Sequence, residues 1–373
     1  MKTFDVYPLY AIEPEIGLGC KLWDKNGNEY LDFYGGHAVI SIGHSHPHYI
    51  KSIESQLHKL GFYSNSVENS LQEKLAKTLG EVSGYPDYSL FMCNSGAEAN
   101  ENALKLASFH TNKSKVIAIN GSFHGRTSGA VACTDNKNIV APFNACHNVE
   151  FIPMNSFEKV DTAIQKGDVA AVIIEGIQGV GGIVAPEKQF MQQLSALCNA
   201  NNVIFIVDEV QSGYGRTGKF FAHQHYGVTP DLITMAKGMG NGFPVGGVLI
   251  SPKFAAKHGL LGTTFGGNHL ACAASLAVLD VLTSEHLLNN ASNTGQYLID
   301  KLKSLPKVKE VRGIGLMIGV EFEFPIAELR KHLLFDKRIF TGYSGSNTIR
   351  LLPPLCITKG EVDQLINSLK ELL

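Results

Sequence analysis

The sequence predicts an α/β protein with a large domain built on a mostly parallel sheet and a second, smaller domain. Continuous apolar runs at 115–120, 170–175 and 203–207 each lead into a glycine-bearing loop, and helical segments such as 186–201 lie between them. Strands that are apolar on both faces and alternate with helices are typical of a parallel sheet covered by helices. The length of 373 residues exceeds the ~250–300 residues at which a single core stops growing, which predicts the second domain.

Local patterns predict the other elements in chain order. Residues 10–33 form short runs around the turn Asp24–Asn28, which is a hairpin signal. The long apolar helix at 268–284 is expected to leave the large domain, and the pattern changes from residue 293. The strands are expected at 89–92, 115–120, 170–175, 203–207, 231–236, 308–323 and 348–352, and the helices at 47–61, 69–82, 97–110, 186–201, 268–284, 296–305 and 359–373.

Composition and charge exclude several classes of protein. The formal net charge of −2 gives no electrostatic footprint for nucleic acid or for an anionic membrane. The N-terminus lacks the apolar core of a signal peptide, and no apolar run approaches the ~20 residues of a membrane span. The seven cysteines form no CxxC pair, and the histidines of 44–48 are expected in a turn that leads into a helix. We therefore expect a cytoplasmic protein with reduced cysteines, no metal, and no nucleic-acid or membrane partner.

Two chemically active residues stand at the ends of predicted buried strands. Asp208 follows the run 203–207, and Lys237 follows the run 231–236 and precedes a glycine-rich loop. Ligands of open α/β sheets bind outside the carboxyl ends of the strands. A lysine there can form a Schiff base, and an acid there can hold a protonated ring nitrogen, which is the pairing that pyridoxal phosphate (PLP) needs. Taken singly, each residue is more often a helix cap or a solvated strand end.

Two glycine-bearing segments supply further candidates. The segment 94–100 joins a predicted strand to a helix, whose free N–H groups are suited to an anion. It lacks the spacing of GxGxxG and of GK[ST], which favours one phosphate over a nucleotide. Phe123 is suited to stacking on a flat ring, and Arg126 to a bidentate bond with a carboxylate. His124 is expected to be a packed or ring-stacking residue, because no second ligand lies at metal spacing.

Taken in order, these segments resemble the class III, ornithine-type aminotransferases of the fold type I PLP family. Within that family the chain most resembles acetylornithine and succinylornithine aminotransferases, and the similarity covers nearly the whole chain. The matching segments are Ser95–Ala99, Phe123–Arg126, Asp208–Gln211, Ala236–Gly238, Thr264–Asn268 and Arg350–Leu355.

The resemblance implies an architecture and a set of cofactor contacts. The small domain would be built from both chain ends, with residues 1–46 and 285–373 flanking a large PLP-binding domain at 47–284. The protein would be a homodimer with shared active sites. Lys237 would bond the cofactor and shuttle the proton, and Asp208 would pair with the ring nitrogen. The further cofactor contacts implied are Ser95, Gly96 and Ala97 at the phosphate, Thr264 at the phosphate of the neighbouring subunit, Phe123 and Val210 on the two ring faces, and Gln211 at the ring hydroxyl.

The resemblance also assigns the substrate carboxylates. Arg126 would bind the α-carboxylate of the amino donor and the distal carboxylate of 2-oxoglutarate, and Arg350 would bind the α-carboxylate of 2-oxoglutarate. The family carries an acid that covers the second arginine while an amine reacts, but Val180 stands at that position. Glu175 is the nearest acid in sequence that could replace it, and His37 is a further candidate for setting specificity. We expect Arg350 to stay open throughout. The family proline after Asn268 is also replaced, by a histidine, which we expect to matter less.

The predicted activity is transfer of the terminal amino group of an N-acylated ornithine to 2-oxoglutarate. The products would be the semialdehyde and glutamate, in arginine biosynthesis. Ornithine or another ω-amino acid is an alternative donor, and the sequence does not choose between acetyl, succinyl and unacylated substrates. A PLP-dependent aminomutase is a second alternative, against which the clamp Arg350 argues, because an aminomutase needs no external oxo acid. A non-catalytic PLP-binding regulator is a third, against which the complete acid, lysine and phosphate set argues.

Overall fold

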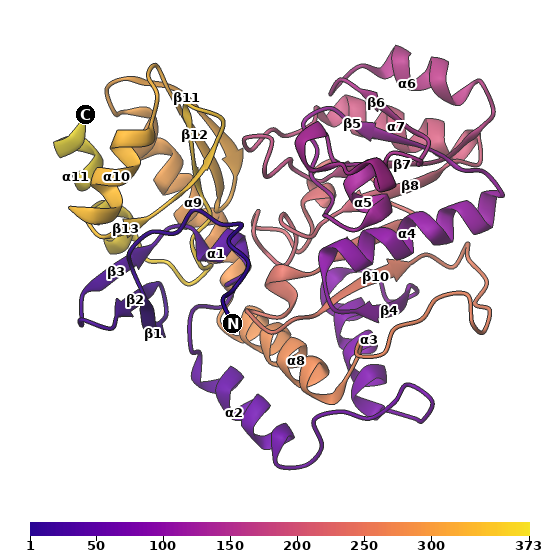
Figure 1. The fold of residues 1–373 in the computed structure, drawn as a ribbon, viewed down its shortest axis with the longest axis horizontal. Helices are drawn as coiled ribbons and strands as arrows, with labels where there is room; N and C mark the ends of the chain where they lie inside the picture. Colours follow the sequence, from indigo (N-terminus) through magenta and orange to yellow (C-terminus); the bar gives the residue numbers. More distant parts are fainter.

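The computed structural model describes all 373 residues and shows two lobes (Figure 1). The larger lobe contains a seven-stranded sheet, and the smaller contains two four-stranded sheets. The sequence prediction of a large α/β domain with a smaller α+β domain built from both chain ends is confirmed. The predicted boundaries near residues 46 and 284 stay a prediction.

The large sheet is parallel except for one strand. Parallel pairing runs through β6, β5, β7, β8 and β9, whereas β10 pairs antiparallel with both β9 and β4. The sequence did not indicate β10, because two glycines open that strand and weaken its apolar pattern. In sheet order the strands are β4 (Ser89–Cys93), β10 (Gly246–Ile250), β9 (Leu232–Met235), β8 (Ile204–Asp208), β7 (Val169–Glu175), β5 (Lys115–Ile119) and β6 (Val149–Ile152).

Both faces of this sheet are covered by helices, so its central strands are buried throughout. Along β7, Val172 and Ile174 pack with α7 (Lys188–Ala200), whereas Ala171 and Ile173 pack with α4 (Gly96–Thr111) on the other face. The α4 face is lined by alanines on both the helix and the strands. Small side chains let α4 lie close to the sheet, which matters below because a residue of α4 reaches the end of β8.

The small lobe joins the two ends of the chain. The strand β13 (Ile339–Phe340) pairs in parallel with β3 (Glu29–Asp32), which follows the hairpin strands β1 (Pro14–Leu18) and β2 (Lys21–Asp24). The last sheet has the order β11-β12-β15-β14. Its strands are β11 (Val308–Ile314), β12 (Met317–Phe322), β15 (Thr348–Leu351) and β14 (Gly342–Ser344).

The helices follow the predicted order with two differences. The helix predicted at 296–305 begins nine residues earlier, as α9 (Leu287–Lys303), because its polar first turns are anchored by the buried Leu287 and Ala291. The sequence also did not indicate the short helices α1 (Gly35–Ala38) and α5 (Ser128–Ala132), nor α6 (Phe157–Ile164) and α10 (Ala327–Phe335). The remaining helices, all of them predicted, are α2 (Pro47–Leu57), α3 (Ser70–Ser83), α8 (His269–Ser284) and α11 (Lys359–Leu372).

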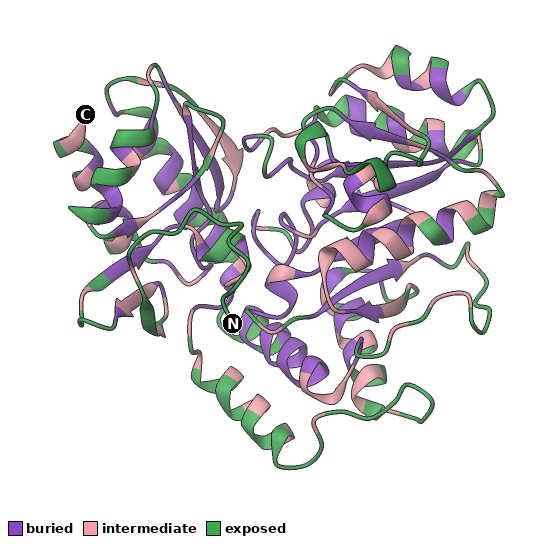
Figure 2. Cartoon of the chain, viewed as in Figure 1, coloured by how far each residue is buried: buried purple, intermediate pink, exposed green.

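No single helix is long and apolar enough to cross a membrane. The most apolar helix, α8, is largely buried inside the protein, and it is bent by 63° from α9 (Figure 2).

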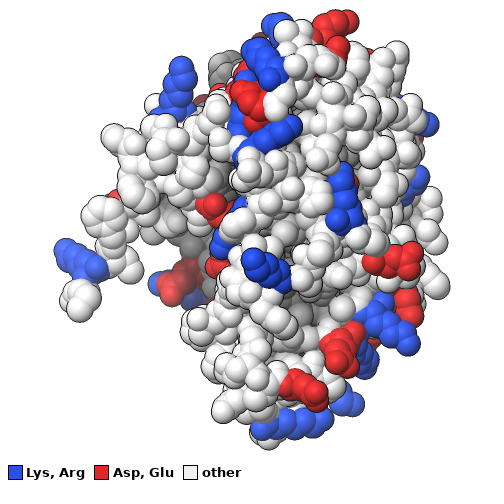
Figure 3. Space-filling model, turned by 90° about the vertical axis from the view of Figure 1, so that its right-hand side faces the viewer, with Lys and Arg blue, Asp and Glu red and all other residues white.

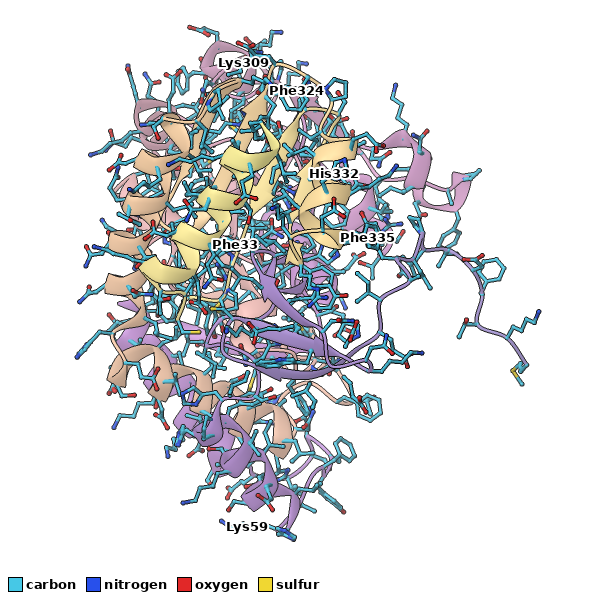
Figure 4. The ribbon with its side chains drawn as sticks, turned by 90° about the vertical axis from the view of Figure 1, so that its left-hand side faces the viewer. Phe33, Lys59, Lys309, Phe324, His332 and Phe335 are labelled. Atoms are coloured by element: carbon cyan, nitrogen blue, oxygen red, sulfur yellow. The ribbon has the colours of Figure 1, made fainter.

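On the surface, positive and negative side chains are intermixed, as one face shows (Figure 3). The first residues of the chain project from the body as an extended arm (Figures 3 and 4).

Candidate active site

The carboxylate of Asp208 lies at the carboxyl end of β8 and is the best-supported group of the site. It accepts hydrogen bonds from Nδ1 of His124 at 2.8 Å, from the side-chain amide of Asn100 at 2.8 Å and from the backbone N–H of Val210 at 2.9 Å. The Thr234 hydroxyl donates to the amide oxygen of Asn100 at 2.7 Å, which fixes the amide orientation. A buried carboxylate held in this way has a defined position, with its remaining acceptor capacity directed at a ligand.

Lys237 follows β9, the neighbouring strand, and begins a short 3₁₀ turn. Its backbone φ of 47° lies in the left-handed region, which costs an ordinary residue ~1–2 kcal/mol and is found where function requires it. Burial lowers the pKa of Lys237 to about 8, although the carboxylates of Asp208 and Glu175 act in the opposite direction. A much larger fraction of this amine is therefore neutral near pH 7 than for an ordinary lysine.

An anion cradle lies at the start of α4. Ser95 caps the helix, and its hydroxyl accepts from the N–H of Glu98 at 3.2 Å. The preceding N–H groups, of Gly96 and Ala97, have no acceptor within the protein. A Cβ atom on Gly96 would lie 2.6 Å from Cγ1 of Val210, so only glycine lets the helix start approach this closely. The free N–H groups and the helix dipole together suit one phosphate.

Glu175 ends β7 beside Asp208, with which it is in register across the two strands. Its carboxylate accepts from the N–H of Phe123 at 3.0 Å and from the N–H of Gly179 at 2.9 Å. Burial, with a contribution from Asp208, raises the pKa of Glu175 to about 7. Glu175 therefore holds two loops of the site in place, a role that the sequence did not indicate. Its predicted contact with the substrate stays a prediction.

Ten of the thirteen predicted site residues line one cavity of about 420 Å³. Val180 and Phe243 also line it. The predicted residues that the structure brings together there are Ser95, Gly96, Ala97, Phe123, Arg126, Glu175, Asp208, Val210, Gln211 and Lys237.

The other three predicted residues lie outside this lining. Thr264 is exposed on the loop before α8, and His37 is exposed on the turn after β3. Arg350 lies on β15 and is only 5% exposed, and no acid forms a salt bridge with it; that its guanidinium stays open to substrate throughout the reaction remains a prediction. Its Nε donates to the carbonyl of Tyr343 at 2.8 Å, its Nη2 donates to the hydroxyl of Tyr34 at 3.3 Å, and its Nη1 has no partner.

Sequence reasoning missed three residues that shape the site. His124 is packed in the interior, as expected, but its hydrogen bond to Asp208 was not predicted. Asn100 lies one turn into α4, and its contact with Asp208 spans 108 positions of sequence. Tyr34 contacts Arg350 across 316 positions. Only the motif around His124 carried a usable signal, because the other two contacts depend on how distant segments pack.

The histidines near the start of α2 are as predicted, in a turn that leads into the helix, where His46 is the N-cap. Each is bound to a different carboxylate, at 2.8–3.1 Å, rather than sharing a centre with the others. No three His, Cys, Asp or Glu side chains are grouped as a metal site requires. The histidine–acid pairs are His44–Asp32, His46–Glu285 and His48–Asp280.

Comparison with known proteins identifies the family. The family model "Aminotransferase class-III" matches residues 7–373. The chain belongs to the class-III aminotransferases. The acetylornithine aminotransferase of Bacillus subtilis (strain 168) is 39% identical over 374 residues, covering 99% of this chain and 96% of that protein. The acetylornithine aminotransferase of Streptococcus mutans is 41% identical over 360 residues, covering 95% and 93%.

Solved structures of aminotransferases have the same fold as this chain. The ornithine aminotransferase of Toxoplasma gondii superposes with a TM-score of 0.92 at 30% identity, covering 100% of this chain and 91% of that one. The acetylornithine aminotransferase of Elizabethkingia anophelis gives a TM-score of 0.85 at 29% identity, covering 99% and 95%. The chain is therefore a PLP-dependent transaminase, and PLP is its cofactor.

The residues of the cavity fit PLP. The unpartnered N–H groups at the start of α4 suit its phosphate, and the buried carboxylate of Asp208 suits a protonated ring nitrogen. The side-chain oxygen of Gln211 is buried and has no hydrogen-bond partner in the protein, so it is free to accept a hydrogen bond from the ring hydroxyl of PLP. We infer that Phe123 and Val210 would face the two sides of the ring, and Lys237 its aldehyde.

Replacing Asp208 by asparagine tests the charge at the end of β8. Asp208→Asn keeps the shape of the side chain but removes the charge that holds the ring proton. We expect kcat to fall by about a hundredfold or more, ~3 kcal/mol, with PLP still bound. Steady-state kinetics and PLP content measured after alkaline release check this. Asp231→Asn, which changes an acid at the opposite, amino end of β9, is the control and should stay near wild type. Unchanged turnover in Asp208→Asn would contradict the role.

The lowered pKa of Lys237 predicts how cofactor uptake depends on pH. Only the neutral amine attacks an aldehyde, so PLP incorporation into the cofactor-free protein should speed up as pH rises and level off above about 8. An ordinary lysine would keep the rate rising toward ~10.4. Stopped-flow absorbance from pH 6 to 10 measures this rate. A midpoint near 10 would show that burial does not depress the pKa of this lysine.

Proposed function

We propose that the protein transfers the terminal amino group of an N-acylated ornithine to 2-oxoglutarate. The products are the N-acylated glutamate semialdehyde and glutamate, and the setting is arginine biosynthesis. The assignment of an N-acylated ornithine as the amino donor is supported by the name that the relatives share. Proteins named acetylornithine aminotransferase, from bacteria and archaea, are 37–41% identical over 95–100% of this chain.

The proton transfer is assigned to Lys237. PLP, when bound, supplies an electron sink for the charge that develops when a proton leaves the carbon beside the amino group. Burial lowers the pKa of Lys237 to about 8, so a larger share of its amine is neutral than for an ordinary lysine, and its Nζ can accept that proton and return it to the neighbouring carbon. Asp208 retains the proton on the ring nitrogen, because its carboxylate is fixed by three hydrogen bonds and buried from water.

The carboxylates of the substrates are assigned to two arginines. Arg126 lies at the rim of the cavity, exposed and without a carboxylate partner in the chain. Arg350 lies on β15, buried and likewise without an acid. A reaction that alternates between an amino acid and a dicarboxylic oxo acid needs carboxylate sites on both sides of the reacting atoms, which two arginines supply. An aminomutase has no need of the second site.

The proposed function is tested by a panel of amino donors. Purified enzyme with 2-oxoglutarate receives N-acetylornithine, N-succinylornithine, ornithine, 4-aminobutyrate or glutamate 1-semialdehyde, and glutamate formation is measured. We expect kcat/KM for an acylated ornithine to exceed that for ornithine by about tenfold or more, since an acyl contact is worth ~1–3 kcal/mol. A preference for ornithine or 4-aminobutyrate would reject the acylated donor. Isomerisation of the semialdehyde without 2-oxoglutarate would indicate the aminomutase.

We also propose a homodimer whose active sites are shared. The loop before α8 presents the exposed Thr264 together with Phe265, which is 60% exposed. The N-terminal arm presents Phe4, 90% exposed, and Tyr7. Exposed apolar side chains in such number mark an interface with another protein. Thr264 would reach the phosphate in the partner's cavity, because it is absent from the lining of its own.

The dimer has a direct test. Light scattering should give twice the chain mass of 40.4 kDa. Thr264→Ala should weaken PLP binding by about fivefold, as loss of one hydrogen bond of ~1 kcal/mol implies, without changing that mass. Serine at this position, which keeps the hydroxyl, is the control. A monomer that is fully active would contradict the shared site.

A further inference from the structure

Arg350 is a buried cation without an anion. Its side chain is 5% exposed, no carboxylate lies within 4.0 Å of it, and Nη1 has no hydrogen-bond partner. Glu175 forms no salt bridge with Arg350; its two oxygens accept from the backbone N–H groups of Phe123 and Gly179, and Val180 is apolar. A buried charge that lacks a partner is costly, which suits this guanidinium to an anionic ligand. The guanidinium is nevertheless absent from the cavity lining, so something covers it.

The cover is Tyr34. Its hydroxyl accepts from Nη2 of Arg350 at 3.3 Å, and the guanidinium carbon lies 5.8 Å from the centre of its ring. The ring occupies space that Gly342 of β14 leaves free. A Cβ atom at position 342 would lie 2.1 Å from Cε2 of Tyr34, so the glycine is required for this ring position. Tyr34 is a neutral phenol, because burial raises its pKa.

His37 holds the phenol in place. A guanidinium can only donate, so the hydroxyl hydrogen of Tyr34 is left to bond Nδ1 of His37, whose ring lies 4.7 Å from the phenol ring. This requires an unprotonated Nδ1. Partial desolvation of the exposed His37 ring by its neighbours, together with the charges of Lys237 and Arg350, lowers the pKa of His37 accordingly. The carbonyl of His37 also accepts from Gln211 at 3.1 Å, which connects the turn to the cavity.

The backbone is shaped for this contact. The turn Gly35–Ala38 is left-handed, with φ values of 55° to 67° at four consecutive residues. The carboxylate of Asp32 holds its start by accepting from the N–H groups of Tyr34 and Gly35 at 2.9 and 2.8 Å. Left-handed geometry at His37 and Ala38 costs energy that the surrounding structure must offset, and such strain is found at functional sites.

We propose that Tyr34, held by His37, is a neutral cover on Arg350 that a substrate carboxylate displaces. Tyr34 and His37 together would then set the affinity of the site for dicarboxylates. Both are positioning residues that act through Arg350. This inference rests on the proposed assignment of Arg350 to a substrate carboxylate. An acid in the same place would repel an incoming carboxylate and neutralise the guanidinium. A neutral phenol does not repel the carboxylate. To bind Arg350, the carboxylate must only break the hydrogen bond from Arg350 to Tyr34 and move the phenol aside, so dicarboxylates retain access in both half-reactions.

Glutarate binding to the PLP-loaded enzyme tests the cover without any turnover. Glutarate is a five-carbon dicarboxylate with no amino or oxo group, so calorimetry or the change in cofactor absorbance reports its Kd alone. Tyr34→Phe keeps the ring and removes the hydroxyl, and we expect glutarate to bind about three- to tenfold more tightly. Butyrate, a monocarboxylate, should be unaffected. Tyr30→Phe, which removes a hydroxyl on β3, is the matched control and should keep the wild-type Kd.

Two further variants separate positioning from folding. His37→Phe removes the acceptor that orients the phenol and should tighten glutarate binding by less than Tyr34→Phe does. Gly342→Ala displaces the Tyr34 ring without altering it and should act in the same direction as Tyr34→Phe. In steady state, Tyr34→Phe should lower KM for 2-oxoglutarate and leave kcat unchanged, a split that a merely structural defect would not produce.

The outcomes distinguish this inference from the proposed function. Weaker glutarate binding in Tyr34→Phe would mean that the hydroxyl is a ligand of the carboxylate, and unchanged binding would mean that Tyr34 covers nothing; either result overturns the proposal. Neither result depends on the amino donor, since glutarate does not react. Conversely, a donor panel that favours free ornithine would reject the acylated substrate while leaving the cover intact.

Discussion

The buried carboxylate of Asp208 is the group on which the rest of the site depends. A carboxylate away from water needs hydrogen-bond donors, and its donors come from α4, from the loop after β5 and from its own turn. These are the segments that also carry the phosphate cradle, Phe123 with Arg126, and Val210. Satisfying one buried charge therefore fixes the relative positions of the groups that would surround the cofactor.

The sheet register extends this arrangement to neighbouring strands. Glu175 ends β7 in register with Asp208, and Thr234 lies opposite Asp208 on β9. Three residues farther along, the half-buried Lys237 feels the charges of both acids. Burial in this enclosed space lowers the pKa of Lys237 to about 8 and raises the pKa of Glu175 to about 7. Such groups can exchange protons near physiological pH.

The sequence predicted those features of the site that depend on local sequence patterns. The acid, the lysine and the phosphate loop each stand where a strand ends, so their approach at one edge of the sheet follows from parallel pairing. The contacts of Asn100 and Tyr34 could not be predicted in this way, because each joins segments more than 100 positions apart whose packing no local pattern records. The cover on Arg350 depends further on Gly342 and on a left-handed turn, and neither has a periodic signature.

Borohydride reduction followed by peptide mass spectrometry tests the central claim most directly. The reduction converts the bond between PLP and its lysine into a stable one, so the modified peptide identifies the residue. We predict that the pyridoxyl group lies on Lys237, in the peptide between Asp231 and Lys253, with full occupancy. Its presence on another lysine, or its absence from a protein that is active, would contradict the assignment of the site to the ends of β8 and β9.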